Sequence, residues 1–171
     1  MIVAAQIAEY LKAKGCTHAF GVVGGANLTL FCEIAKKLKV VSVHHEQAAA
    51  LASLYFYKAS GRIAPCLVAN GGAQTNAITG VLDAYQDGIP MLVISGNEML
   101  KFARNPHPRS VGFQGIKTVE AVSWCTKAAE SVDNAQGAKM ALDGLYRVAM
   151  SPRQGPVWLD VPSDVANSEA E

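Results

Sequence analysis

The fold of this chain is decided by residues 40–52, which read VVSVHHEQAAALA. Residues 40–43, three of them valine, predict a short buried strand. The alanine-rich run from Glu46 predicts a helix that continues to about Ser60 and ends at Gly61. A single carboxylate, that of Glu46, therefore lies where a strand passes into a helix.

The same alternation of strands and helices runs along the whole chain. Further strands are predicted at 17–23, 65–69, 90–95, 124–127 and 156–161, and a loop with two prolines at 96–115. Further helices are predicted at about 24–38, 72–85 and 135–150, and near the N-terminus, where Val3, Ile7 and Leu11 share one face and Gly15 follows the last turn. This order predicts an α/β fold, a doubly wound parallel sheet with helices on both faces. We expect one domain over residues 1–165 and a polar C-terminal tail over 166–171.

The composition excludes several classes of partner. The formal net charge is +1 and only 17% of residues are charged, so no basic face for nucleic acid is predicted. No apolar run has the roughly 18 residues that a membrane span needs, and no signal peptide is recognisable. The four cysteines have no metal-ligand spacing. We expect a cytoplasmic protein with reduced thiols.

Four distinctive segments follow predicted strands and should meet at one edge of a parallel sheet, where such folds bind ligands. They are Gly24–Asn27, His45-Glu46, Asn70–Asn76, and the loop from Gly96. None is a known phosphate-binding loop, because neither GxxxxGK[ST] nor GxGxxG is present. We expect no metal site, since His44 and His45 have no further ligand at suitable spacing.

Glu46 has two interpretations from the residues alone. A glutamate in the first turn of a helix is often stabilised only by the helix dipole. Alternatively, the apolar residues 40–43 and the alanines after Glu46 form low-dielectric surroundings that raise its pKa and suit it to proton sharing.

Several motifs, in order, resemble the pyrimidine-binding domain of thiamine-diphosphate enzymes, and their acetolactate synthase-like branch most closely. Residues 45–49 are similar to the start of the catalytic helix, and residues 70–76 to a turn usually written S-G-P-G-x-T-N. The other matching segments are Phe20-Gly21 with 24–27, 77–80 with 83–85, 87–90 with 94–96, 112–114 (similar to a segment ending F-Q-E) and 155–162. The resemblance covers nearly the whole chain.

The resemblance implies a role for each matching residue. Glu46 would activate thiamine diphosphate through N1′ of its aminopyrimidine ring, and Gln114 would be a second catalytic residue beside the substrate. The pyrimidine pocket would be formed by Glu46, Gln47, Asn70, Gly71, Gly72, Ala73 and Asn76, and the substrate side by Gly24, Gly25 and His45. The substrate would be a small 2-oxo acid, decarboxylated or joined to a second carbonyl compound.

The chain also departs from the family pattern. Asn70 replaces a usual Ser or Thr, Gly72 a usual Pro, Val23 a frequent Pro, and Gly115 a frequent Glu. These changes bear on the substrate more than on the role of Glu46. The loop with Lys101, Arg104, His107 and Arg109 is cationic: it is either a site for a carboxylate substrate or an ordinary solvated loop.

No Gly-Asp-Gly motif, which in this family helps to hold Mg²⁺ and the diphosphate, occurs in the chain. The resemblance therefore implies a pyrophosphate-binding partner subunit with a GDG…N-type motif, which holds the Mg²⁺ in an α2β2 heterotetramer. One alternative is the excised first domain of a longer acetolactate synthase-like enzyme. Another is a non-catalytic binding or regulatory homologue, against which the presence of Glu46 argues.

Overall fold

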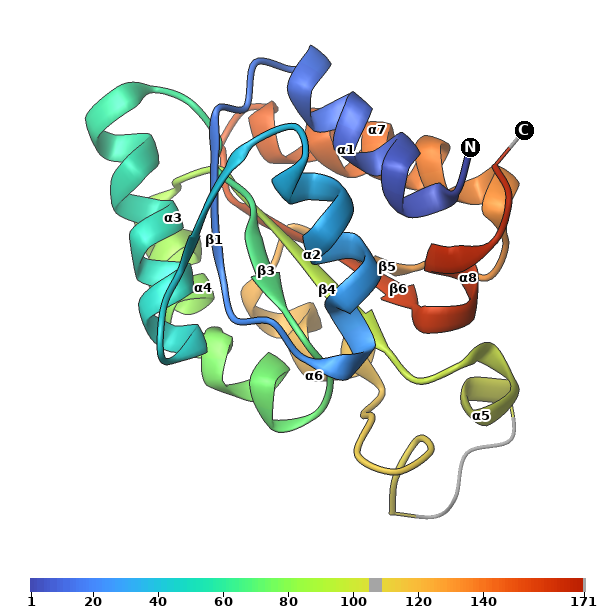
Figure 1. The fold of residues 1–171 in the computed structure, drawn as a ribbon. Coiled ribbons are helices and arrows are strands. Elements are labelled where there is room, and N and C mark those ends of the chain that lie inside the picture. Colours follow the sequence, from blue (N-terminus) through green and yellow to red (C-terminus); the bar gives the residue numbers. More distant parts are fainter. Residues whose placement is uncertain (105–108, 171) are drawn as a thin grey trace.

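The computed structural model describes residues 1–104 and 109–170, and they form a six-stranded, entirely parallel sheet (Figure 1). The strand order is β2-β1-β3-β4-β6-β5. The strands are β1 (His18–Gly21), β2 (Lys39–Ser42), β3 (Cys66–Val68), β4 (Met91–Asn97), β5 (Ala128–Ser131) and β6 (Pro156–Pro162). The predicted fold class, a doubly wound parallel α/β sheet, is confirmed.

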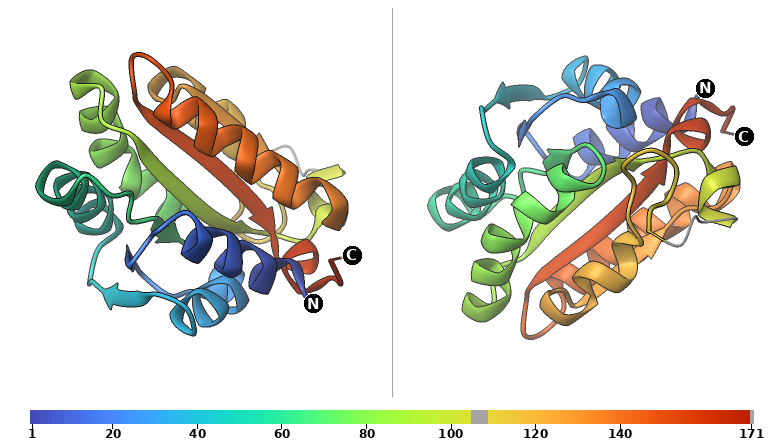
Figure 2. Two further views of the ribbon diagram at one scale, coloured as in Figure 1. Left: turned by 90° about the horizontal axis from the view of Figure 1, so that it is seen from above. Right: turned by 90° about the horizontal axis from the view of Figure 1, so that it is seen from below.

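The helices cover both faces of this sheet (Figure 2). Helices α1, α2, α7 and α8 pack on one face, and α3, α4 and α6 on the other. Their bounds are α1 (Val3–Ala13), α2 (Leu28–Ala35), α3 (Glu46–Ser60), α4 (Gly72–Asp87), α5 (Leu100–Arg104), α6 (Thr118–Val122), α7 (Ala135–Met150) and α8 (Ser163–Asn167), with 3₁₀ turns η1 (Gly25–Asn27) and η2 (Ser123–Cys125).

The two longest strands, β4 and β6, supply core residues on both faces of the sheet. Alternate residues of β4 point to opposite sides, so Leu92 and Ile94 join one apolar layer while Met91 and Val93 join the other. β4 and β6 pair along their whole lengths, and all of their residues are buried. Such continuously buried strands are typical of parallel sheets with two covered faces.

Three predicted elements differ from the structure. The predicted loop at 96–115 contains the end of β4 and the short helix α5. The strand predicted at 124–127 is wrong: Trp124 and Cys125 lie in η2, and the strand β5 begins at Ala128. β2 is present but is not buried, because it is an edge strand whose residues are exposed or half-buried.

The described end of the chain packs beside its beginning (Figure 1). Ile2 and Glu169 form an antiparallel bridge, and the Ala170 N–H donates to the Met1 carbonyl at 2.7 Å. Ala166 and Ala170 are buried in this contact, within the segment for which the sequence predicts a polar tail. Over the described residues, no helix combines the length and apolar character needed to cross a membrane.

Candidate functional site

The four segments singled out in the sequence meet at the carboxyl edge of the sheet, along the lower side of Figure 1. They follow β1, β2, β3 and β4, which are consecutive neighbours in the sheet. Gly24 lies so close to the turn after β3 that a Cβ on it would be 2.7 Å from the Ala69 Cβ. The chain leaves β1 for β2 on one side and returns to β3 on the other, which is the kind of switch point where open α/β sheets bind ligands.

Glu46 is the first residue of α3, and two contacts define its position. The Nδ1 atom of His45 caps the helix by accepting the Gln47 N–H at 3.2 Å. The Asn76 side chain donates from Nδ2 to Glu46 Oε2 at 3.0 Å. Glu46 and Asn76 were both predicted as site residues, and the structure brings them into direct contact across two helices.

The two helices that carry this pair pack unusually closely. A Cβ on Gly80 of α4 would lie 2.6 Å from the Ala50 Cβ and 2.9 Å from the Leu51 backbone nitrogen in α3. Only glycine permits this approach, which fixes α3 against α4 one turn beyond the Glu46–Asn76 contact.

The expected low-dielectric surroundings of Glu46 are absent from the described part of this chain. Glu46 is half-buried, Ala48 is exposed, and β2 leads into the site as a half-exposed edge strand. The alanines that are buried, Ala49 and Ala50, face α4 and the sheet instead of the carboxylate edge. A dry environment for this carboxylate would therefore have to come from a second unit placed over it.

The turn at residues 70–73 is shaped by Gly71. Its φ of +61° is a left-handed conformation, and a Cβ there would collide with the Gln114 carbonyl. Gly72, which replaces a usual Pro, is the first residue of α4, and the space next to its Cα is open. Since Pro is also suited to the first position of a helix, this departure preserves the turn.

A buried polar network beneath the turn was not predicted from the sequence. Asp160 of β6 is 2% exposed and accepts hydrogen bonds from Ser95 Oγ (2.6 Å), Asn97 Nδ2 (2.8 Å), Gln74 Nε2 (2.9 Å) and Ser131 Oγ (3.2 Å). Burial raises the pKa of Asp160, although these hydrogen bonds act in the opposite direction. The Gln74 Oε1 in turn accepts the Gly71 N–H at 3.2 Å, so the network supports the turn. The signal in the sequence was an aspartate inside the apolar run 156–161.

Gln114 joins the same edge through Asn70. Its Nε2 donates to Asn70 Oδ1 at 2.9 Å, and Asn70 Nδ2 donates to Glu98 Oε1 at 3.0 Å. The sequence did not single out Glu98, which directly follows β4. Gln114 itself is exposed on a tight turn between Val111 and Gly115.

The remaining predicted residues have simpler surroundings. Gly25 is exposed with open space at its Cα, and neighbouring Asn27 is buried, where it accepts the Gly24 N–H at 2.7 Å. His44 is exposed in the turn before α3. In the cationic loop Lys101 and Arg109 are exposed, whereas His107 and the side chain of Arg104 lie outside the described residues.

The polar groups at this edge fit one end of a thiamine diphosphate molecule. The carboxylate and amide side chains can form hydrogen bonds with the ring nitrogen and amino groups of a flat heterocycle. The open space at the glycine turn leaves room for such a ring. The described residues contain no cluster of three or more His, Cys, Asp or Glu that would hold a metal ion. The donor set therefore suits the aminopyrimidine end of this cofactor.

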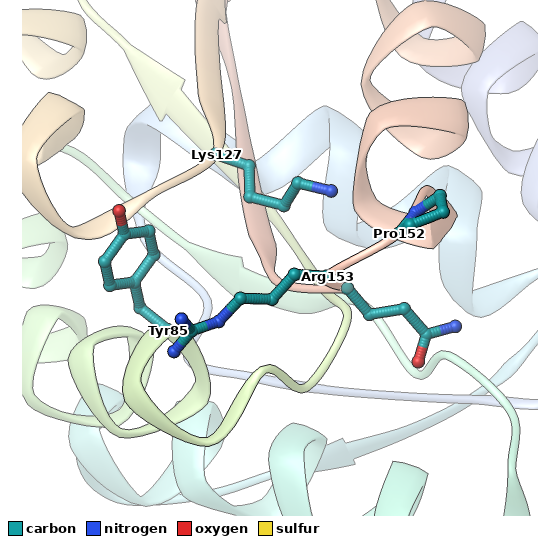
Figure 3. A pocket seen from close by; sticks show the side chains of 5 residues that line it. Tyr85, Lys127, Pro152 and Arg153 are labelled. Atoms are coloured by element: carbon teal, nitrogen blue, oxygen red, sulfur yellow. The ribbon is translucent and has the colours of Figure 1, made fainter.

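A cleft of about 280 Å³ at the opposite edge of the sheet is not part of this site (Figure 3). It is lined by Tyr85, Lys127, Pro152, Arg153 and Gln154. The ammonium group of Lys127 donates to the Val148 and Ser151 carbonyls and to Ser151 Oγ, at 2.6–3.1 Å. These contacts cap the end of α7, so this lysine has a structural role.

The comparison with known families agrees with this geometry. Residues 1–120 match the family model described as "Thiamine pyrophosphate enzyme, N-terminal TPP binding domain", and the chain belongs to this family. Among individual proteins, it is 32% identical to the acetolactate synthase of Arthrospira platensis over 95% of this chain and 28% of that protein. It is also 32% identical to the acetolactate synthase large subunit of Haemophilus influenzae, over 96% of this chain and 28% of that protein. The chain thus spans about 28% of the length of these relatives.

Proposed function

We propose that this domain binds the aminopyrimidine end of thiamine diphosphate and that Glu46 activates the cofactor through N1′, in an enzyme acting on a 2-oxo acid. The observation that carries the proposal is the Glu46 carboxylate, 3.0 Å from Asn76 Nδ2 at the carboxyl edge of the sheet, in a chain of this family. The reaction class is decarboxylation, carboligation or both.

The chain's own residues hold and orient the ring. Glu46 shares a proton with N1′, and Asn76 fixes the direction of its carboxyl group. Thiamine diphosphate bound here would supply the carbon nucleophile that this chemistry of 2-oxo acids requires. Gln47 and residues 70–73 shape the pyrimidine pocket, while Gln114, His45, Gly24 and Gly25 border the substrate.

The rest of the site must come from a second unit that binds the diphosphate and Mg²⁺. In one arrangement this unit is a separate subunit with a GDG…N-type motif, in an α2β2 assembly. In the other it is a further part of a longer chain, an arrangement supported by relatives in which the matched region is 28% of one polypeptide. A unit seated over the half-exposed Glu46 would also supply the dry surroundings that this domain lacks.

A Glu46→Gln variant tests the catalytic proposal. The assembled enzyme, meaning this domain with its diphosphate-binding unit, is assayed for decarboxylation of 2-oxo acids with thiamine diphosphate and Mg²⁺. We expect turnover to fall by at least about a hundredfold, because glutamine cannot exchange a proton with the ring. A Glu130→Gln variant, which removes an exposed carboxylate from β5, should retain the wild-type rate. Unchanged turnover in Glu46→Gln would refute the catalytic role and favour a binding or regulatory homologue.

Native mass spectrometry of the protein purified from its own source, with Mg²⁺ present, separates the two arrangements. A second polypeptide with bound thiamine diphosphate supports the split enzyme. A single longer polypeptide with the cofactor supports the fused one. This domain alone, without cofactor, would contradict both.

A further inference from the structure

Glu98 occupies a built position at the edge that holds the proposed site. It is the first residue after β4, and its Oε1 accepts the Asn70 Nδ2 at 3.0 Å and the Gln114 backbone N–H at 3.4 Å. Asn70 and Gln114 are also joined directly, at 2.9 Å. Hydrogen bonds thus join Glu98, Asn70 and Gln114 pairwise, and Asn70 and Gln114 belong to the proposed site.

The backbone around Glu98 is adapted to its side chain. Gly112 has a φ of +65°, and a Cβ there would lie 2.8 Å from both Cγ and Cδ of Glu98. A Cβ on Gly115 would lie 2.5 Å from the Val111 carbonyl oxygen, 2.7 Å from Asn97 Oδ1 and 2.8 Å from the same Cγ. Gly112 therefore leaves room for the Glu98 side chain, and Gly115 lets the 111–115 turn close against it, which holds the carboxylate in a fixed direction.

Hydrogen bonds from the described residues occupy only part of the Glu98 carboxylate. Within residues 1–104 and 109–170, Asn70 and Gln114 donate to Oε1, and a carboxylate has about four acceptor positions on its two oxygens. These two donors are neutral amide groups, which orient the negative charge without neutralising it. Glu98 is half-buried, so its charge is only partly screened by water.

We propose that Glu98 is a specificity-determining residue, whose carboxylate accepts a hydrogen bond from a donor group, a hydroxyl or an ammonium, on the substrate. The same charge disfavours substrates that carry a second carboxylate, because like charges brought together at a site are costly. This inference rests on the proposed function, since it assigns Glu98 to the substrate side of the same site. The substrate class is a 2-oxo acid with a hydroxyl or amino substituent.

The test compares three probes in the assembled enzyme with thiamine diphosphate and Mg²⁺. Pyruvate carries neither group, hydroxypyruvate carries a hydroxyl donor, and 2-oxoglutarate carries a second carboxylate. We measure kcat/KM for each probe in the wild type, in Glu98→Gln, which keeps the shape and removes the charge, and in Glu130→Gln, which removes an exposed carboxylate on β5.

In Glu98→Gln, we expect the ratio of kcat/KM for 2-oxoglutarate to that for pyruvate to rise by about tenfold. The ratio for hydroxypyruvate to pyruvate should fall by about fivefold, mainly through KM, because an amide is a weaker acceptor than a carboxylate. Neither ratio should change in Glu130→Gln. Ratios that are the same in Glu98→Gln and the wild type would overturn the role of Glu98 while leaving the proposed function intact. A wild-type enzyme that decarboxylates none of the three probes and binds no thiamine diphosphate would overturn both.

Discussion

At the scale of single residues, we expect the Glu46–Asn76 hydrogen bond to affect turnover more than it affects the stability of the fold. Asn76 is exposed on the first turns of α4, and its side chain donates a hydrogen bond to Glu46. Removing this bond leaves no buried polar group unsatisfied, so the cost to folding should be small. The cost to function should be larger, because an unheld carboxyl group samples directions that do not point at the ring.

We therefore predict that Asn76→Ala lowers turnover by about tenfold but changes the free energy of unfolding by less than about 0.5 kcal/mol. Steady-state kinetics of the assembled enzyme and urea denaturation measure the two quantities. A variant that loses stability and turnover in proportion would show that Asn76 acts only through the fold.

The residues that sequence analysis could find were those with a recognisable local setting. Glu46 stands at a strand-to-helix boundary, and Asn76 lies in a motif. For Asp160 the sequence showed only an acid inside an apolar run, and for Glu98 it showed no signal, because their partners lie far away in the chain: Gln74 is 86 positions from Asp160, and Asn70 is 28 positions from Glu98. Their environments exist only once the strands are side by side.

At the scale of elements, the position of Glu46 depends on the packing of α3 against α4. A Gly80→Ala change places a methyl group 2.6 Å from the Ala50 Cβ and 2.9 Å from the Leu51 nitrogen, so the two helices must separate. We predict a loss of about 1–3 kcal/mol in the free energy of unfolding, measured by thermal or urea denaturation. Turnover should also fall, since separation displaces Glu46 from Asn76.

Gly144 provides the matched control, because it lies within α7 and a Cβ added to it would meet no atom within 4 Å. Gly144→Ala should therefore stabilise the protein by about 0.5–1 kcal/mol through the better helix propensity of alanine. Equal effects of the two substitutions would show that the α3–α4 contact is not tight.

The elements that could be predicted were those with a clear pattern in their own stretch of sequence. The helix predicted at 135–150 matches α7, which has apolar residues on one face and Asn134 as an N-cap that accepts the Gly137 N–H at 2.8 Å. The strand β5 was missed because it is an edge strand with exposed or half-buried residues, and it lacks the apolar pattern of the central strands. Trp124, the first residue of the strand predicted at 124–127, is 58% exposed.

At the scale of the whole molecule, Asp160 adds side-chain hydrogen bonds between β6 and its two neighbours in the sheet, and it joins these three strands to α4. Its hydrogen bonds reach β4 through Ser95 and Asn97, α4 through Gln74, and β5 through Ser131. The network therefore ties the centre of the sheet to the turn that borders the proposed site. Because this group is a buried acid, the stability of the whole domain should depend on its protonation.

The direction of that dependence follows from the raised pKa of Asp160, which burial causes. An acid with a raised pKa in the folded state binds its proton more tightly there than in the unfolded chain, where the ordinary value is 3.8. Its stabilising contribution is fully present below that ordinary value and is lost as the pH rises through the folded-state pKa.

We predict that the free energy of unfolding of the wild type, minus that of Asp160→Asn, is larger at about pH 4 than at about pH 7. The asparagine cannot titrate, and taking the difference between the two proteins cancels the other carboxyl groups. Urea denaturation across this pH range measures the difference, and a value that is constant or grows with pH would mean that the four hydrogen bonds outweigh burial and keep Asp160 ionised.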